Sequence, residues 1–581
     1  MISFVQTLSD LLWDALQRAF PDASLPNACL EITLSTQPHF GHYQCNSAMR
    51  FSKALGCSPR TIAETWLKAL PANTFIAKVD IAGPGFINIW VQADAVTAQL
   101  TMMASRERLC LPQALAERIV IDFSSPNIAK QMHVGHLRST IIGDCLARIF
   151  EYLGFDVLRL NHIGDWGTAF GMLIAYLKQH QPDVLSGQQH TDLSHLVNWY
   201  RASKKSFDED ADFKQIAQQE VVALQRGERD SLHAWQIICA ISKENYQEIY
   251  DLLDIRVTDR GESFYNPLLA ATVNDLTAKG LVSISDGAKC IFLEGFSNRD
   301  GEPLPLMIQK SDGGYNYAST DMAALKHRVE VEHATRILYL TDSGQAQHFA
   351  MIFKAADLAG YLKQEGITVR LDHVPFGLVL GPDGKKFKTR SGETEALIDL
   401  IQAAIVEADR LLQERGLDLS AEALHHTAHV LGINAIKYAD LSNNRIHDYV
   451  FSYERMLRFD GNTAAFLMYA YVRIQSLKRR TKVNPSIYLN TPLELLQPAE
   501  LELGLHLLRF EEILRQISHD LLPNRLCEYL FNLAEKFNAF FRDCRVEGVS
   551  EQNARLHLCD ITARILKTGM ELLGLKVIEK M

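Results

Sequence analysis

The chain has 581 residues, of which 47% are apolar and 22% charged, proportions that are ordinary for a globular protein. This length exceeds that of one compact core, so we expect several domains. The net charge of −10 does not indicate a nucleic-acid partner, but it does not exclude one, because phosphate contacts need only a local basic face. Residues 1–20 lack the features of a signal peptide, and no apolar run is long enough to span a bilayer. We therefore expect a cytoplasmic protein with no membrane association.

The ten cysteines are scattered along the chain, and no two of them form a CxxC pair. This spacing argues against a disulfide framework and against a zinc site, and it favours buried thiols in a reducing compartment. The sequence also has no Walker A loop and no GxGxxG motif after a strand. We expect no metal site built by the protein itself.

Residues 1 to about 115 have the pattern of a separate α+β module. An amphipathic helix opens it, and residues 40–70 have the pattern of two helices that are divided at Ser58-Pro59. Alternating apolar residues on both sides of Gly83-Pro84-Gly85 predict a β-hairpin. A further helix is expected to close the module.

The most informative segment begins with a strand-like run at Ile119–Ile121. A polar turn follows, then His133-Val134-Gly135-His136, then a helical apolar pattern. Two histidines therefore stand where a strand gives way to a helix, whose start offers free N–H groups and a positive dipole end. Such a helix start is an anion site, which Gly135 would let a ligand approach closely. The imidazoles can donate hydrogen bonds to phosphoryl oxygens.

On either side of these histidines the sequence reads SSPNIAK and LRSTIIGD. Four letters alone would also fit histidines that merely cap or pack a helix. With its flanks, the segment resembles the HxGH signature of class I aminoacyl-tRNA synthetases, and in particular the arginyl-tRNA synthetase family. A similar segment at His162-Ile163-Gly164 lacks the second histidine, because Asp165 follows it.

The core begins near Arg118, where strand, helix and strand form a βαβ unit that implies a parallel sheet. We predict a multidomain α/β protein with a Rossmann-like catalytic domain at 116–400, which contains a helical insertion at about 168–260. A helical connector at 401–459 and an all-α domain at 460–581 follow. The resemblance implies that the all-α domain binds the anticodon. It also implies that the α+β N-terminal domain holds the outer corner of the tRNA.

Within the predicted all-α domain, five apolar residues fall on one helical face and indicate a buried core: Leu526, Leu530, Leu533, Phe537 and Phe540. A basic cluster stands near the start of this domain: Arg473, Lys478, Arg479, Arg480 and Lys482. Such a run usually forms a solvated face, and contact with the tRNA backbone is the alternative.

The segment from Gly381 to Gly392, GPDGKKFKTRSG, combines glycines with cations. It resembles a degenerate KMSKS loop, in which Lys386 takes the first lysine position and Thr389 replaces the second lysine. Alone, it would be read as a basic surface turn. The resemblance implies that Lys386 and Lys388 act on the ATP phosphates with His133, Gly135 and His136. It also implies that Lys130, just before the HxGH motif, substitutes for the missing lysine.

A guanidinium is planar, always charged and carries five donors, so its pocket should present carboxylates and an aromatic face. Tyr317 and Asp321 are four residues apart, hence on one helix face. The resemblance assigns both to the arginine side chain, together with Glu262 and Gln345. It also assigns three contacts with the α-amino and carboxylate end: Ser125, Asn127 and His136. Taken singly, these residues would be read as an ordinary surface pair, a solvated turn residue or a helix cap.

The resemblance therefore implies an aminoacyl-tRNA ligase of the bacterial type that activates L-arginine with ATP and Mg²⁺. The arginyl group would then pass to the 2′-hydroxyl of the terminal adenosine of tRNA(Arg). It also implies a monomer whose activation step requires bound tRNA. Three alternatives remain: a class I synthetase for another amino acid, a small-molecule nucleotidyltransferase, and a non-catalytic tRNA-binding relative. An apolar substrate would leave Asp321 and Glu262 buried without partners, which is costly.

Overall fold

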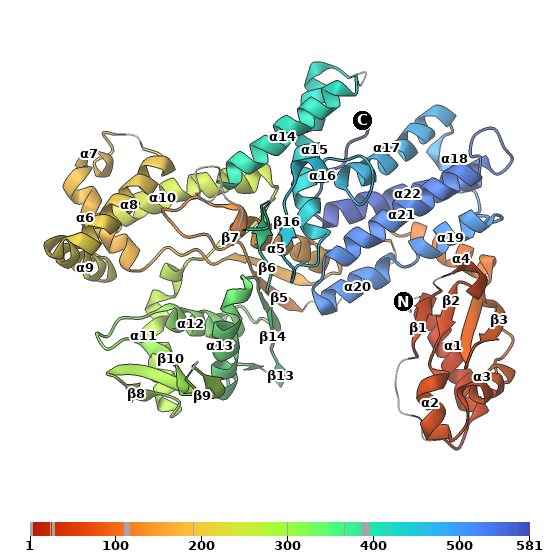
Figure 1. Cartoon of the computed structure of the whole chain (residues 1–581), viewed down its shortest axis with the longest axis horizontal. Helices are drawn as coiled ribbons and strands as arrows, with labels where there is room; N and C mark the ends of the chain where they lie inside the picture. The colour runs from red at the N-terminus through yellow and green to blue at the C-terminus, as the bar shows by residue number, and fades with distance from the viewer. Residues whose placement is uncertain are drawn as a thin grey trace.

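The computed structural model of the chain describes residues 4–23, 25, 30–35, 37–109, 117–189, 191–298, 300–364, 366–381, 383–385, 396–416 and 419–581. It contains an N-terminal α+β module, a parallel-sheet domain with a helical insertion, and a helical C-terminal region (Figure 1). The fold class predicted from the sequence is therefore confirmed. Within the described ranges, no helix is both long enough and apolar enough to cross a membrane.

The N-terminal module is an antiparallel sheet in the order β1-β2-β4-β3, with helices packed against it. The predicted hairpin is present as β3 and β4. The helix expected from residue 40 onwards begins only at Ala48, because Tyr43 and Cys45 are buried in a short strand that pairs with β4. The elements are α1 (Phe4–Ala19), β1 (Ile32–Leu34), η1 (Pro38–Phe40), β2 (Tyr43–Cys45), α2 (Ala48–Leu55), α3 (Pro59–Lys68), β3 (Ile76–Ala82), β4 (Phe86–Val91) and α4 (Ala93–Ala104).

The central domain is built on a five-stranded parallel sheet in the order β14-β11-β5-β6-β7. The apolar run Ile119–Ile121 forms the middle of β5 and is fully enclosed, as expected for a strand covered on both faces. The predicted βαβ unit is β5, α5 and β6. The elements are β5 (Arg118–Asp122), α5 (Val134–Tyr152), β6 (Asp156–Asn161), β7 (Thr258–Asp259), β11 (Arg336–Tyr339) and β14 (Arg370–His373).

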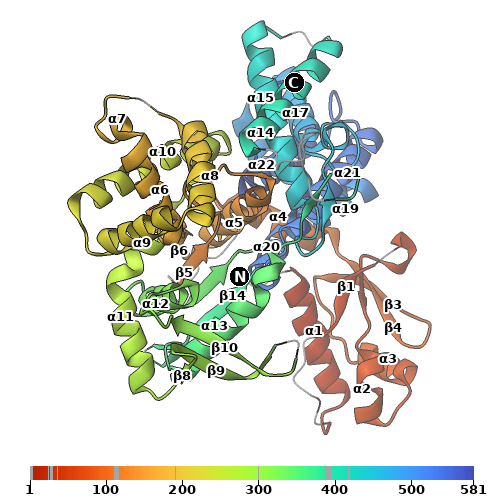
Figure 2. The same ribbon diagram turned by 60° about the vertical axis from the view of Figure 1, so that its left-hand side comes forward.

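A bundle of helices interrupts the sheet between β6 and β7 and projects away from the C-terminal helices (Figures 1 and 2). Its internal contacts join α6 to α8 and α9, while α10 runs back towards the sheet. These helices are α6 (Thr168–His180), α7 (Pro182–Leu185), α8 (Leu193–Glu209), α9 (Ala211–Gln225) and α10 (Arg229–Leu252). We call this bundle the helical insertion.

Between β7 and β14 the chain adds a small antiparallel sheet and three helices. Cys290 and Leu306 lie in strands of a separate sheet of order β10-β9-β8, which is not part of the parallel sheet. The elements are α11 (Glu262–Ala278), β8 (Ser283–Ser285), β9 (Ala288–Ser297), β10 (Pro303–Gln309), α12 (Tyr317–Glu330), η2 (Ser343–Gln345), α13 (Ala346–Leu358), β12 (Lys363–Gln364) and β13 (Ile367–Thr368).

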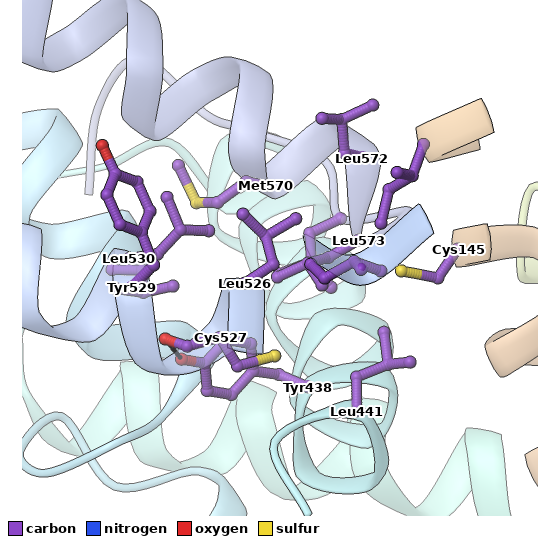
Figure 3. Packing of buried hydrophobic residues seen from close by; sticks show 14 of the residues in the cluster. Cys145, Tyr438, Leu441, Leu526, Cys527, Tyr529, Leu530, Met570, Leu572 and Leu573 are labelled. Atoms are coloured by element: carbon purple, nitrogen blue, oxygen red, sulfur yellow. Dashed lines mark hydrogen bonds between the residues drawn. The ribbon is translucent and has the colours of Figure 1, made fainter. Parts of the chain in front are cut away.

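In the described residues from Leu397 onwards, the regular elements are helices and one two-residue strand, β16 (Tyr449–Val450), which pairs in parallel with β15 (Val379–Leu380). The predicted apolar stripe of α21 is completely buried. Figure 3 shows Cys145 of α5 beside Leu573 in this helical core. The helices are α14 (Leu397–Glu414), α15 (Ala421–Leu441), α16 (Tyr453–Met456), α17 (Ala464–Thr481), α18 (Pro485–Leu489), α19 (Pro498–Leu507), α20 (Phe510–Asp520), α21 (Asn524–Asp543) and α22 (Gln552–Leu572).

The N-terminal module docks on the C-terminal helices. Helix α4 contacts α19, where the apolar side chains of Val96 and Leu100 lie against Gly504. On α22, the Arg564 guanidinium donates hydrogen bonds to the carbonyls of Ala104 at 2.7 Å and Arg106 at 2.8 Å. The first and last parts of the chain are therefore joined directly, as Figure 1 shows in red and blue.

Candidate active site

The parallel sheet places the histidine motif at a topological switch point. After β5 the chain moves through α5 to β6 on one side, whereas β11 adds to the other side of β5. The loops that leave the carboxyl ends of β5 and β11 therefore diverge, and the crevice between such loops is where open α/β sheets bind ligands. The loop after β5 carries Ser125 and Asn127 and leads into His133 and His136 at the start of α5, and the segment after β11 carries Gln345. Helix α5 is joined to the segment after β11 by a hydrogen bond from Ser139 Oγ to the Leu340 carbonyl at 3.0 Å.

His133 and His136 cap the start of α5 reciprocally. Nδ1 of His133 accepts a hydrogen bond from the backbone N–H of Gly135 at 3.0 Å, and Nδ1 of His136 accepts from the backbone N–H of His133 at 3.1 Å. Because both Nδ1 atoms are acceptors, a neutral ring carries its hydrogen on Nε2, which makes Nε2 a donor. Burial, His133 and Lys130 lower the pKa of His136 to about 3, so this imidazole is neutral near pH 7.

Gly135 makes this arrangement possible. A Cβ at residue 135 would lie 2.7 Å from Cε1 of His133, closer than real Cβ atoms approach a neighbour. The ring centroids of the two histidines are 4.2 Å apart. The glycine in the motif therefore gives room to the His133 imidazole, in addition to the ligand approach expected from the sequence.

The loop between β5 and α5 holds an unusual backbone shape. Ser124, Ser125 and Ala129 have φ angles of 71°, 50° and 58°, in the left-handed region that residues other than glycine rarely adopt. The backbone N–H of Ser125 donates to Asn161 Oδ1 at 2.9 Å, and that of Ala129 donates to Ser242 Oγ at 3.1 Å. Such conformations persist where the surroundings over-determine them, and they cluster at functional sites.

Asn127 lies beside the Gly164-Asp165-Trp166-Gly167 segment. The two segments are bridged by backbone hydrogen bonds, from Ile128 N–H to the Gly164 carbonyl and from Gly164 N–H to the Pro126 carbonyl. A Cβ at Gly164 would lie 2.5 Å from Asn127 Oδ1. The glycine therefore allows the Asn127 side chain to occupy its position.

Three carboxylates form an acidic wall in the same domain. Burial and the negative charges of Asp165 and Asp321 raise the pKa of Glu262 to about 8. Asp165 is itself largely buried, and it accepts hydrogen bonds from the backbone N–H of Ser263 at 2.8 Å and from its hydroxyl at 2.6 Å. This pair of bonds fixes the start of α11, where Glu262 stands. A buried carboxyl that is influenced by two further carboxylates favours a bound cation.

Tyr317 and Asp321 stand one turn apart at the start of α12, as the spacing predicts. The Tyr317 side chain is 72% exposed, and its pKa is raised by burial of the hydroxyl, by Glu262 and by Tyr200. Asp321 Oδ2 lies 2.6 Å from Nε2 of His348. Tyr317, Asp321 and Glu262 therefore belong to one connected set.

His348 is a site candidate that the sequence reasoning missed. It stands on α13, three residues after Gln345, whose side-chain amide donates to Asp342 at 2.8 Å. Asp122, at the end of β5, was also missed: it accepts from Ser125 Oγ at 3.0 Å and from the buried Arg328 at 2.7 Å. The i,i+3 spacing from Gln345 is the one local signal that could have pointed to His348, and no local signal marks Asp122.

Lys386 and Lys388 fall outside the described residues. The segment that carries them ends at Ala396, which forms an antiparallel bridge with His133, and the Leu397 N–H donates to the Met132 carbonyl at 2.9 Å. At its other end, Gly381 N–H donates to the Lys385 carbonyl at 2.8 Å. The cation-bearing segment thus rejoins the described chain beside the histidine motif.

Lys130, by contrast, is described and exposed on the loop after β5. Its Nζ lies 5.8 Å from the ring centroid of Tyr200 on α8. In the basic cluster, Lys478 pairs with Asp560 at 2.6 Å and Arg480 pairs with Glu547 at 2.9 Å, whereas Arg479 and Lys482 are exposed.

Two cavities lie outside this set of residues. One of about 290 Å³ is lined by α15, β16, α16 and the segments that flank them, and one of about 560 Å³ is lined by α10, His429 of α15 and Lys576. Neither contains a side chain named above as a site candidate. Among the residues that the structure describes, no group of three or more His, Cys, Asp or Glu is placed to hold a metal ion.

Three family models match the chain in succession. The arginyl-tRNA synthetase N-terminal domain matches residues 6–91, the class I (R) tRNA synthetase catalytic domain matches residues 99–453, and the DALR anticodon-binding domain matches residues 467–581. The catalytic match alone spans more than half of the chain.

Relatives cover the whole length. Proteins named arginine–tRNA ligase are 60% identical in Protochlamydia amoebophila, covering 100% of both chains, and 50% identical in Nostoc punctiforme, covering 94% of both. The crystal structure of an arginyl-tRNA synthetase from Plasmodium falciparum superposes with a TM-score of 0.86 at 34% identity, covering 100% of both chains. A Thermus thermophilus arginyl-tRNA synthetase shares the fold, with a TM-score of 0.80 at 21% identity over 99% of this chain and 100% of that one. The chain therefore belongs to the arginyl-tRNA synthetase family of class I aminoacyl-tRNA synthetases.

Proposed function

We propose that this protein activates L-arginine with ATP and transfers the arginyl group to the 3′ end of tRNA(Arg). In the first step, an oxygen of the arginine carboxylate attacks the α-phosphorus of ATP. The bond to the β-phosphate breaks, and arginyl-adenylate and pyrophosphate are formed. In the second step, the 2′-hydroxyl of the terminal adenosine of tRNA attacks the arginyl carbonyl, loses its proton and releases AMP.

The acidic wall is the observation that carries the choice of amino acid. Burial, Asp165 and Asp321 raise the cost of ionising Glu262, and a permanently charged guanidinium relieves that cost. We assign Asp321 and Glu262 to the guanidinium, Tyr317 to its face and Gln345 to a polar contact at its edge. His348 is assigned as the partner that orients Asp321, given its 2.6 Å contact.

The histidine pair supports the assignment of the phosphate side. A neutral imidazole whose Nδ1 accepts from the backbone presents Nε2–H as a fixed donor, and preorganised donors stabilise charge that develops in the transition state. We assign His133 and His136 to the phosphates, with Lys130, Lys386 and Lys388 as the cations. Ser125 and Asn127, on the left-handed loop, are assigned with His136 to the amino and carboxylate groups of arginine.

Mg²⁺ is proposed to arrive with ATP, because this ion keeps several waters and is usually bound through substrate phosphates in such sites. We further propose a monomer that works in the cytoplasm. The eight cysteines among the described residues are all free thiols, as is usual for proteins of a reducing compartment.

The test is to incubate the purified protein with ATP, bulk tRNA and each of the twenty amino acids in turn. We expect only arginine to become acid-precipitable with the tRNA. Charging of a different amino acid would identify the protein as a class I synthetase of another specificity. Adenylate formation that does not depend on tRNA, with no charging, would identify a small-molecule nucleotidyltransferase.

A further inference from the structure

We propose that the helical insertion fixes Lys130 in its working position, with Ser242 and Tyr200 as positioning residues. This inference rests on the proposed function, in which Lys130 supplies positive charge to the ATP phosphates. Ser242 lies on α10 and Tyr200 on α8, so both come from the bundle that interrupts the sheet. Both are more than 65 residues from Lys130 along the chain, and only the fold brings them to it.

Ser242 secures the residue next to the lysine. Ala129 has a left-handed backbone, with a φ of 58°, and its N–H donates to Ser242 Oγ at 3.1 Å. Ser242 is 4% exposed, and its hydroxyl donates in turn to the Ile238 carbonyl at 2.9 Å. That second bond directs the hydroxyl hydrogen away from Ala129, which leaves an oxygen lone pair for the Ala129 N–H.

Tyr200 contacts the lysine itself. The Lys130 Nζ lies 5.8 Å from the Tyr200 ring centroid, within the range of about 6 Å over which a cation is attracted to an aromatic face. The ring is half-buried and packs against the apolar core of the insertion, which includes Met172 and Phe213. An anchored ring of this kind restricts the otherwise free stem of an exposed lysine.

A third contact secures the start of the same loop, just after β5. The hydroxyl of Tyr250, near the end of α10, lies 2.7 Å from Ser124 Oγ, and Ser124 is the first left-handed residue of the loop, with a φ of 71°. The insertion thus contacts the loop at three residues: Ser124, Ala129 and Lys130. Strained backbone of this kind needs outside contacts to persist.

The position of Lys130 matters to the site because its charge reaches the histidine pair. Lys130 contributes to the lowered pKa of His136, and Tyr200 contributes to the raised pKa of Tyr317. Tyr200 therefore faces both the lysine of the phosphate side and the aromatic residue of the proposed arginine side. A shift of the insertion would move Lys130 relative to both groups.

The experiment compares Tyr200→Leu with the matched control Tyr200→Phe, which keeps the aromatic face. Single-turnover formation of arginyl-adenylate is measured with saturating tRNA at varied ATP and arginine. We expect Tyr200→Leu to lower the rate about tenfold while Tyr200→Phe stays within about twofold of the wild type. The KM for arginine should stay within about twofold in both, since neither variant removes a carboxylate.

A double-mutant cycle decides whether Tyr200 acts through Lys130. In a Lys130→Met background, Tyr200→Leu should have little further effect, because the group that it positions is already gone. Losses that multiply, or a Tyr200→Leu enzyme with a wild-type rate, would overturn the proposal. Ser242→Ala is run through the same cycle with the same expectation.

Two measurements keep the outcomes separate. Thermal unfolding and tRNA binding identify a variant that has lost its fold, and if Tyr200→Leu is such a variant, the cycle of Ser242→Ala with Lys130→Met decides the outcome. A wild-type protein that fails to charge arginine would refute the proposed function. A wild-type protein that charges arginine but gives independent losses in the cycle would refute only the positioning role.

Discussion

Arg138 and Asp440 form a buried ion pair that joins the histidine-bearing helix to the C-terminal helices. Nε of Arg138 lies 3.1 Å from Oδ2 of Asp440, and both side chains are at most 1% exposed. Arg138 stands on α5 two residues after His136, and it also donates to the His447 carbonyl at 2.9 Å. Helix α5 is thus anchored to Asp440 of α15 and to the His447 carbonyl in the segment that follows α15.

Breaking this pair should destabilise the protein strongly. Asp440→Ala leaves the Arg138 charge buried without its partner, which costs about 3–5 kcal/mol of the free energy of unfolding. Urea unfolding followed by circular dichroism measures the loss. The matched control is the double variant Arg138→Met/Asp440→Leu, which removes both charges and should recover most of the loss. A single variant as stable as the wild type would show that the pair adds nothing.

His136→Ala should reduce kcat for arginine activation by about 10²-fold or more, because a preorganised donor to the developing phosphoryl charge is removed. His136→Asn separates this effect from helix capping, since its amide oxygen can still accept from the His133 N–H. We expect near wild-type thermal stability and a low kcat for the asparagine variant. Steady-state kinetics with pyrophosphate release measures both variants, and a wild-type rate in either would contradict the assignment.

Asp321→Ala should weaken the use of arginine far more than the use of ATP. Removing one partner of a hydrogen-bonded charge pair costs about 2–5 kcal/mol, so kcat/KM for arginine should fall by a factor of about 30 or more. Asp321→Asn is the matched control, because it keeps the shape and an acceptor for His348 but loses the charge. It should show most of the loss. An unchanged KM and kcat for arginine in the alanine variant would remove Asp321 from the pocket.

Arginine binding should release a proton below about pH 8. Burial, Asp165 and Asp321 raise the pKa of Glu262 to about 8, so this carboxyl is mostly protonated in the free protein at pH 7. A guanidinium favours the ionised form, so binding lowers that pKa and expels the proton. Affinity should therefore rise with pH by up to about tenfold per unit, and level off above pH 8.

Calorimetry in buffers of different ionisation enthalpy counts the released proton. Glu262→Gln is the control: it should bind arginine more weakly, and its affinity should not change between pH 6 and 8. A wild-type affinity that stays constant over this range, or that falls as the pH rises, would contradict the role given to Glu262.

Gly135→Ala should displace the His133 ring, because the added Cβ would lie 2.7 Å from Cε1. The cap on α5 would then lose one hydrogen bond, worth about 1 kcal/mol of unfolding free energy. We expect kcat to fall together with this modest loss of stability. Gly143 is no substitute control, since a Cβ there would meet Phe123 at 2.2 Å. Thermal unfolding and steady-state kinetics measure both losses, and a Gly135→Ala protein with wild-type kcat and stability would contradict this role of the glycine.

The parts that were predictable from the sequence are those whose signal is local. The strand at Ile119–Ile121, the helix after His136 and the i,i+4 pair of Tyr317 and Asp321 depend on neighbours a few residues away. The predicted start of the helix at residue 40 was wrong because Tyr43 and Cys45 pair with β4, which lies more than 40 residues further along the chain. Tertiary pairing there overrides the local pattern.

The supporting residues could not be predicted, because they meet the site only through the fold. Ser242 reaches Ala129 across 113 residues, and Asp321 meets His348 across 27. Neither Ser242 nor Tyr200 carries a motif, and a serine or tyrosine on an amphipathic helix has no local feature that marks a role. Their positions follow from how α8 and α10 pack, which depends on the whole insertion.

The attachment of the first domain has a mechanical consequence. Arg564 of α22 holds the end of α4, and α19 packs on the same helix, so the N-terminal module travels with the C-terminal helices. A tRNA that contacts both domains would therefore meet two surfaces at a fixed distance from each other. An RNA whose two contact regions were spaced differently could not engage both domains at once.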